Sequence, residues 1–262
     1  MNTCHIFKCE GIAKNYKNEP VVQDISLALH EGGFISLLGP SGVGKTTLFN
    51  VLSGVEKPDA GKVFLNGEDV SGISGKVSYM LQKDLLLEYY TVLDNVILPL
   101  LIRREKKKEA RKFAAGFFPM FGLEGYEKNY PSELSGGMRQ RAALLRTCLA
   151  AYAPCGAGKK EMVILLDEPF SALDAITRRK MQLWYADIAQ KMKISTLFIT
   201  HDVEEALALS DTIYILNGKP GCITKKIDVK RPQNGEFAEQ KQMILEAIGV
   251  AATPTFLHSS EF

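Results

Sequence analysis

The segment Gly39-Pro40-Ser41-Gly42-Val43-Gly44-Lys45-Thr46 constrains the fold of this chain more than any other. It fits the pattern GxxxxGK[ST], follows the apolar run Phe34–Leu38 and precedes Thr47–Leu52, which we expect to be helical. Glycines let backbone N–H groups approach phosphate oxygens, the lysine supplies a cation, and the last hydroxyl is a ligand suited to Mg²⁺. The positive end of the following helix adds to the anion site. A strand, this loop and a helix therefore predict a phosphate-binding site.

The remaining pattern predicts an α/β fold. Before residue 85, short apolar runs are separated by turns at Lys57–Gly61 and Asn66-Gly67, which indicates a small antiparallel sheet beside the first parallel strand. From Thr91 to about Tyr152 the pattern is helical, and Thr91 is the expected cap of a helix that runs through Val92, Val96 and Leu100. After Gly158 strands and helices alternate, and we expect them at Met162–Leu166, Ala175–Lys191, Thr196–Thr200, Val203–Ser210 and Thr212–Leu216.

Two adjacent carboxylates end the apolar strand Ile164–Leu166. Side chains alternate along a strand, so Asp167 is expected to face the Mg²⁺ held by Thr46 while Glu168 points elsewhere. One carboxylate then serves as metal partner and the next as the general base that holds the attacking water. Kinases, GTPases and ATPases share the phosphate loop, but the Asn-Lys-x-Asp pattern of guanine recognition is missing from the sequence.

Composition excludes several classes of protein. Lys and Arg number 32 against 30 Asp and Glu, a net charge of +2 that gives no support to nucleic-acid binding. The N-terminus does not resemble a signal peptide, and no uncharged run approaches the ~18 residues of a membrane span. Five cysteines without a CxxC pair argue against disulfides or a zinc site. We interpret the charged stretch Arg103–Lys112 as a solvated helix face, the alternatives being a membrane or nucleic-acid patch.

Further motifs carry a family resemblance. The run Leu134-Ser135-Gly136-Gly137-Met138-Arg139-Gln140-Arg141 resembles the signature of ABC-family ATPases. Other motifs of that family follow its order: Gln82 matches the Q-loop, Ser171-Ala172-Leu173-Asp174 the D-loop and His201 the switch histidine, while Tyr16 takes the place of the adenine-stacking aromatic. The resemblance covers roughly Ile6 to Val229. Met138 departs from the glutamine that many members carry, and Ala151–Glu161 looks like an inserted surface loop.

The resemblance implies a P-loop NTPase (RecA-like) core with an N-terminal antiparallel β subdomain and an inserted helical subdomain. Residues 1–229 would form the ATPase domain, with 1–84 and 159–229 as nucleotide-binding core and β subdomain and 85–158 as helical signature subdomain. The tail 230–262 has no assigned role.

The resemblance also implies the ligands and the roles of the residues. ATP would be bound by Tyr16 and by Gly39–Thr47, and Mg²⁺ by Thr46, Gln82 and Asp167. Glu168, His201 and Gln82 would act in hydrolysis. Ser135, Gly136 and Gly137 would cap the γ-phosphate of a second copy in a head-to-tail, ATP-dependent homodimer, with Asp174 at the interface.

Two stretches, Leu81–Leu87 and Thr91–Val96, look like those of importers of the nitrate, sulfonate, taurine and hydroxymethylpyrimidine group. That likeness implies integral membrane permease subunits as partners and, indirectly, a solute-binding protein. The chain would then lie peripherally on the cytoplasmic face of the cell membrane, driving transport of a small solute without contacting nucleic acid. The alternative is a soluble ABC ATPase acting in DNA repair or translation.

Overall fold

A six-stranded sheet forms the centre of the computed structural model, which describes residues 5–152, 162–229 and 236–248. Its strand order is β10-β9-β3-β8-β7-β6, parallel from β9 to β6, with β10 antiparallel at the edge. The strands are β3 (Phe34–Leu38), β6 (Ser78–Met80), β7 (Met162–Asp167), β8 (Ile194–Thr200), β9 (Thr212–Asn217) and β10 (Cys222–Asp228). Every residue of β3, β7 and β8 is buried, as expected for parallel strands covered on both faces.

A second, four-stranded antiparallel sheet has the order β2-β1-β4-β5 and confirms the expected small sheet. Its strands are β1 (His5–Tyr16), β2 (Glu19–His30), β4 (Ala60–Leu65) and β5 (Glu68–Asp69). β1 and β2 are longer than the apolar runs in the sequence, because backbone pairing continues through polar residues to Tyr16 opposite Glu19.

The helices are α1 (Lys45–Leu52), α2 (Val92–Val96), α3 (Leu98–Ile102), α4 (Lys107–Ala115), α5 (Gly136–Ala151), α6 (Ala175–Met192), α7 (Val203–Leu209) and α8 (Glu236–Ile248). Thr91 does cap α2, accepting a hydrogen bond from the Asp94 N–H at 3.2 Å. The single helix expected from Val92 to Leu100 is wrong. The segment forms two helices, α2 and α3, because Pro99 cannot donate the backbone hydrogen bond that a continuous helix needs.

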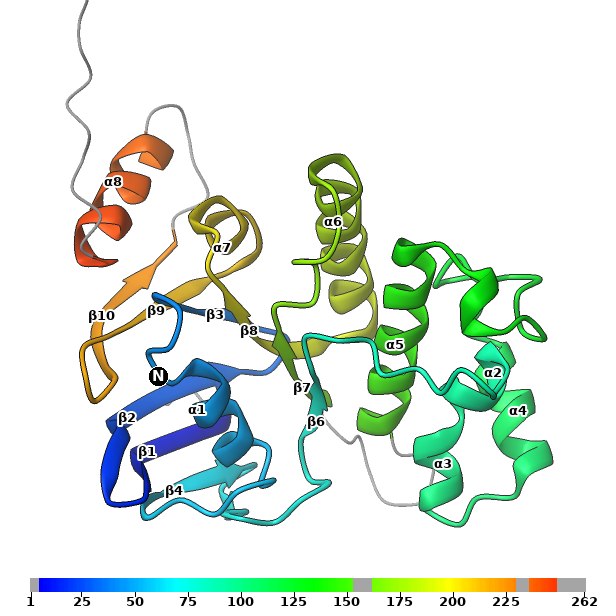
Figure 1. Ribbon diagram of the computed structural model, residues 1–262, viewed down its shortest axis with the longest axis horizontal. Coiled ribbons are helices and arrows are strands. Elements are labelled where there is room, and N and C mark those ends of the chain that lie inside the picture. Colours follow the sequence, from blue (N-terminus) through cyan, green and yellow to red (C-terminus); the bar gives the residue numbers. More distant parts are fainter. Residues whose placement is uncertain (1–4, 153–161, 230–235, 249–262) are drawn as a thin grey trace, which may run out of the picture.

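Gln82 precedes the helical part of the chain. It lies in irregular chain after β6, and the first helix of this region starts only at Val92. From there α2–α5 gather beside the β6 edge of the central sheet, on the side away from β1 and β2 (Figure 1).

Alternating side chains divide the core between the two faces of the central sheet. Ile35 and Leu37 of β3 pack with α1 and the antiparallel sheet, whereas Phe34 packs with apolar residues of α5 and α6. A third cluster joins α7, α8 and β9, with Ile244 of α8 fully buried in it. The phosphate loop thus leaves a strand that is fixed from both faces.

The tail that had no assigned role contains α8, packed on α7 and β9. The Asn217 side chain donates to the carbonyls of Ala247 and Ile248 at 3.4 and 3.5 Å, so the end of α8 is attached to the end of β9. The predicted loop insertion Ala151–Glu161 falls mostly on residues outside the described ranges.

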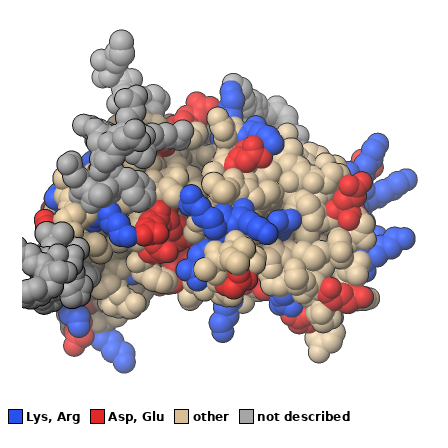
Figure 2. Space-filling view, turned by 90° about the horizontal axis from the view of Figure 1, so that it is seen from above, with Lys and Arg blue, Asp and Glu red and all other residues tan. Residues whose placement is uncertain are grey.

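The surface is mixed in charge. On the face that carries α6–α8, basic and acidic side chains lie close to one another (Figure 2). Among the helices that the structure describes, none combines the length and the hydropathy that crossing a membrane requires.

Candidate active site

The phosphate loop joins β3 to α1, and at two of its positions, Gly39 and Gly44, only glycine fits. Gly44 has φ 102, and a Cβ there would lie 2.6 Å from Cγ1 of Val22. A Cβ on Gly39 would lie 2.3 Å from the Leu216 carbonyl oxygen. The loop is therefore enclosed by β2 and β9, and its backbone is free to turn inward. The first N–H groups of α1 have no acceptor within the helix and remain available to an anion.

Lys45 is folded over this loop and is only 7% exposed. Its Nζ donates to the carbonyls of Gly39 and Pro40, both at 2.8 Å. Burial lowers the pKa of this amine, and the charges of Glu168 and Asp167 act in the opposite direction. A third N–H of the ammonium group remains for a ligand.

Asp167 faces the end of the loop, as expected. Its Oδ2 accepts a hydrogen bond from Oγ1 of Thr46 at 3.1 Å and another from the hydroxyl of Tyr79 at 3.3 Å. Burial raises the pKa of Asp167, although both hydrogen bonds act to lower it. Tyr79 did not stand out in the sequence, but its strand β6 pairs with β7, which brings it to this carboxylate.

The Thr46–Asp167 pair suits a hard cation that completes its shell with substrate oxygens. Hydroxyl and carboxylate oxygens are the donors that Mg²⁺ takes, usually with one or two carboxylates and the phosphates of the substrate. Within residues 5–152, 162–229 and 236–248, no three His, Cys, Asp or Glu side chains gather into a metal cluster, so a site made only of such side chains is not formed there.

Glu168 points away from Asp167, for a reason other than strand alternation. β7 ends at Asp167, and Glu168 has φ 44, a left-handed conformation that is costly for this residue type. The turn places its Oε1 at 3.2 Å from Nδ1 of His201 and its Oε2 at 3.3 Å from Nε2 of Gln82. Three residues from three distant segments thus meet at one carboxylate.

These three side chains line a cavity of about 770 Å³. Ser171 and Arg139 line it as well, so the D-loop and the signature helix α5 both border it. Arg139 binds the carboxylate of Asp84 through Nε at 3.0 Å and through Nη2 at 3.2 Å. The chain beside Gln82 is therefore attached to α5, a link between residues 55 apart that the sequence motif does not reveal.

The signature residues open α5. Ser135 is its N-cap and accepts a hydrogen bond from the Met138 N–H at 3.4 Å. A Cβ on Gly136 would meet Leu173 at 3.8 Å, and one on Gly137 would meet Thr177 at 3.5 Å. In the described chain no hydrogen bond joins Ser135–Gly137 to the phosphate loop.

Two further predicted residues have local partners. Tyr16 ends β1, and its hydroxyl donates to Glu56 at 2.6 Å. Partial burial and Glu56 raise the pKa of this phenol, while the neighbouring Thr47 hydroxyl lowers it, which places Tyr16 beside α1. Asp174 caps α6 and accepts hydrogen bonds from the Ile176 and Thr177 N–H groups at 3.1 and 3.0 Å.

Comparison with known families decides what this arrangement is. The sequence model of the family described as ABC transporter matches residues 22–171, more than half of the chain. The chain belongs to this family. As an ABC ATPase, it binds and hydrolyses ATP.

Curated relatives of this ABC ATPase include two import proteins. The formylaminopyrimidine import ATP-binding protein of Halalkalibacterium halodurans is 43% identical over 203 residues, which is 78% of this chain and 76% of that protein. An aliphatic sulfonates import ATP-binding protein of Rhodococcus jostii is 39% identical over 241 residues, 91% of each chain.

Solved structures agree on the fold. The dimeric structure of MJ0796, a bacterial ABC transporter cassette, matches with a TM-score of 0.70 and 28% identity, covering 86% of this ABC ATPase and 99% of the cassette. The cassette MJ1267 matches with a TM-score of 0.78 over 95% of this chain and 99% of that one, at 20% identity. The expected RecA-like core with an antiparallel β sheet is thus confirmed as that of an ABC cassette.

Proposed function

We propose that this ABC ATPase is the ATP-binding subunit of an importer, working as a head-to-tail homodimer on a separate membrane permease. The observation that supports this most is the meeting of Glu168, His201 and Gln82 beside a complete phosphate loop. The importer class is supported by relatives that share its length and are named as import proteins.

Each residue of the site has a defined task in this proposal. Lys45 and the N–H groups of the loop bind the β- and γ-phosphates, and Tyr16 stacks on the adenine. Glu168 accepts the proton of the water that attacks the γ-phosphorus, the bond to the β-γ bridging oxygen breaks, and ADP and phosphate result. His201 holds Glu168 and the γ-phosphate in one geometry.

Thr46 and Asp167 would hold Mg²⁺, with Gln82 as a further oxygen donor. When bound, Mg²⁺ neutralises charge on the transferring phosphoryl group. The existing hydrogen bond between Thr46 and Asp167 keeps these oxygens at the mouth of the loop.

The second half of each site would come from the other copy. Ser135 and the first N–H groups of α5 form an exposed anion-binding end, which in the proposed dimer reaches the γ-phosphate bound by the partner's loop. Asp174, at the start of α6, lies at the interface between the two copies. ATP would then join the two subunits.

Exposed apolar side chains near Gln82 support a membrane partner. Leu85, Leu87, Tyr89 and Tyr90 lie within eight residues of Gln82 and are 51, 47, 95 and 45% exposed. If ATP binding moves Gln82, a permease segment packed on these side chains would be displaced with it. This would place the chain on the cytoplasmic face of the membrane; a solute-binding protein would act only through the permease.

The test of the catalytic assignment is Glu168→Gln. We expect preserved ATP binding, a more persistent ATP-bound dimer and turnover slowed by roughly 10²–10⁴-fold, the usual contribution of a general base. Steady-state hydrolysis and size-exclusion chromatography with ATP measure the two effects, and the exposed Glu31→Gln is the matched control. Undiminished hydrolysis in Glu168→Gln would refute the assignment.

The importer assignment has its own test. A photo-crosslinking amino acid at Tyr89 should attach the chain to a polytopic membrane protein in its native cells. The same group at Ile73, also exposed but on the loop after β5, is the control. Attachment of Tyr89 to ribosomal or DNA-repair proteins instead would contradict an importer.

A further inference from the structure

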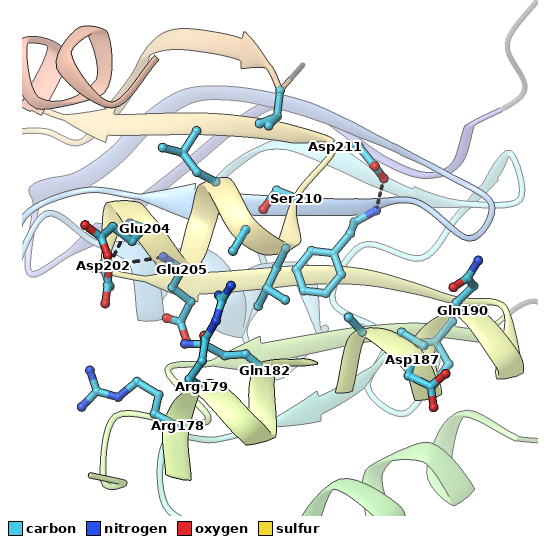
Figure 3. Close-up of a pocket in the computed structure, with 18 of the residues that line it drawn as sticks. Arg178, Arg179, Gln182, Asp187, Gln190, Asp202, Glu204, Glu205, Ser210 and Asp211 are labelled. Carbon is cyan, nitrogen blue, oxygen red and sulfur yellow. Dashed lines mark hydrogen bonds between the residues drawn. The ribbon is translucent and has the colours of Figure 1, made fainter. Parts of the chain in front are cut away.

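A cavity of about 1170 Å³ lies between α6 and α7, and one of the residues that line it is a buried glutamate (Figure 3). This residue is Glu205 of α7, which is only 7% exposed. A charged group removed from water is costly unless it is hydrogen-bonded. The proposed reaction gives Glu205 no task, so its place in the core requires another explanation.

Glu205 connects three elements. Nε2 of Gln182 on α6 donates to its Oε1 at 2.8 Å, and the hydroxyl of Thr200 at the end of β8 donates to its Oε2. Both partners are buried, at 4% and 1% exposure. Burial raises the pKa of Glu205, while these two hydrogen bonds act to lower it. One side chain therefore fixes α6, α7 and β8 to one another.

Glu205 is bonded to both neighbours of His201, to Thr200 through its side chain and to Asp202 through its backbone N–H. The Thr200 hydroxyl, besides donating to Glu205, accepts a hydrogen bond from the N–H of Asp202 at 3.0 Å. The carboxylate of Asp202 accepts in turn from the N–H of Glu205 at 3.3 Å. His201 lies between these two residues, and its ring nitrogen is 3.2 Å from Glu168. Its position is thus set by a hydrogen-bonded loop that closes on Glu205.

On the α6 side, the charge of Arg178 acts on Glu205, and Arg178 is itself bound to the D-loop. Arg178 donates through Nη2 to the carbonyl of Leu173 at 3.0 Å, and its charge acts to lower the pKa of Glu205. Figure 3 shows Arg178 and Gln182 on the α6 side of the cavity and Glu205 reaching toward Gln182 from α7.

We propose that Glu205 is a positioning residue for ATP hydrolysis, which holds His201 against Glu168 by fixing Thr200 and Asp202 to α6. The inference rests on the proposed role of His201 at the γ-phosphate. A fully satisfied buried network specifies one geometry, and a change in one member leaves the others with unmatched donors. The consequence falls on the orientation of His201 and not on ATP binding, because none of these residues belongs to the phosphate loop.

The first test compares two variants of nearly unchanged shape, Glu205→Gln and Thr200→Val. Each should lower kcat by about 10- to 100-fold, the cost of misplacing a group in a site by about 1 Å. KM for ATP should change little, and cooperative unfolding in urea should show that both variants fold. Glu204→Gln is the matched control: it is next in sequence, exposed and paired with Lys241 on α8, so its kcat should stay at the wild-type value.

A double-mutant cycle tests whether the effect passes through His201. In the His201→Ala background, Glu205→Gln should alter single-turnover hydrolysis by less than about twofold, because coupled residues are not additive. The same loss in both backgrounds, or an unchanged kcat in Glu205→Gln, would overturn the inference. Wild-type turnover in His201→Ala alone would instead refute the proposed role of His201 in the site.

Discussion

Two helices of this chain, α1 and α5, begin at glycine-rich segments, yet their surroundings differ. At the start of α1, Lys45 is buried and Thr46 donates to Asp167, and β2 and β9 enclose the loop so tightly that a Cβ on Gly39 or Gly44 would overlap neighbouring atoms. At the start of α5, Gly136 is exposed, and a Cβ there would make only ordinary contacts.

This difference indicates that the end of α1 binds ATP, whereas the end of α5 completes a site whose ATP is held elsewhere. The end of α1 has a cation, a hydroxyl and a carboxylate from its own chain, and it needs only ATP. The end of α5 offers N–H groups and the Ser135 hydroxyl, and Arg139 in its first turn is already paired with Asp84 and Glu88. Such an end becomes useful when a phosphate that is already held elsewhere is brought to it, which is what the proposed dimer does. Variants at the two ends should therefore fail in different ways.

Among variants at the two helix ends, the largest effect is expected from Lys45→Ala. It removes the buried cation that the loop carbonyls hold in place, and both ATP affinity and turnover should fall, kcat by about 10²–10³-fold as for other preorganised electrostatic groups. Isothermal titration of the isolated chain with ATP measures the first effect. Lys180→Ala, exposed on α6, is the control. Unchanged affinity in Lys45→Ala would show that the loop is not the ATP site.

Gly136→Asp should act on the other end alone. The new carboxylate has room beside Leu173, so the chain should fold and bind ATP as the wild type does. In the dimer it would face the γ-phosphate, and like charges there cost several kcal/mol, so ATP-dependent association should weaken by about 10²-fold or more. Sedimentation with and without ATP measures this. Weaker ATP binding by the monomer would contradict the separation of the two ends.

Mixing the two variants sharpens the comparison. A dimer of one Lys45→Ala chain and one Gly136→Asp chain has a site with both defects and a site with neither. The mixture should therefore hydrolyse ATP faster than either variant alone. The control is a chain that carries both substitutions. Neither alone nor mixed with one of the single variants can it form an intact site. No gain on mixing would contradict head-to-tail pairing.

A smaller effect, on stability, is expected from Asp167→Asn. Burial raises the pKa of Asp167 above its value in the unfolded chain, so folding is opposed once pH rises above the unfolded pKa. At neutral pH, without ATP, the variant should have a higher Tm, by about 2–4 °C for each kcal/mol gained. The gain should begin to shrink as pH falls through the folded pKa of Asp167 and vanish at its unfolded pKa. The substitution should abolish activity at any pH. A lower Tm at neutral pH, with the exposed Asp228→Asn as control, would contradict this.

The sequence predicted features in which local chain conformation and chemistry coincide. GxxxxGK[ST] specifies both a turn and a ligand, so β3, the loop and α1 fall where expected. Pairings between distant segments were not predictable. Tyr79 reaches Asp167 only through the register of β6 and β7, and Arg139 reaches Asp84 across 55 residues. The orientation of Glu168 was predicted, but its cause is a left-handed residue after the strand.

The smallest effect is expected from Ser135→Ala, and it tests the open end of α5 most directly. The cap hydrogen bond to Met138 is long, at 3.4 Å, so its loss should cost about 0.5 kcal/mol in urea unfolding, the low end for N-caps. ATP affinity of the isolated chain should not change, because the hydroxyl lies outside the phosphate loop. Turnover should still fall further than this stability loss explains, since in the dimer the hydroxyl would face the partner's γ-phosphate. Ser132→Ala, exposed in the preceding turn, should change neither quantity. If Ser135→Ala instead weakens ATP binding by the isolated chain, the two helix ends share one site within a single copy, and the contrast between them is lost.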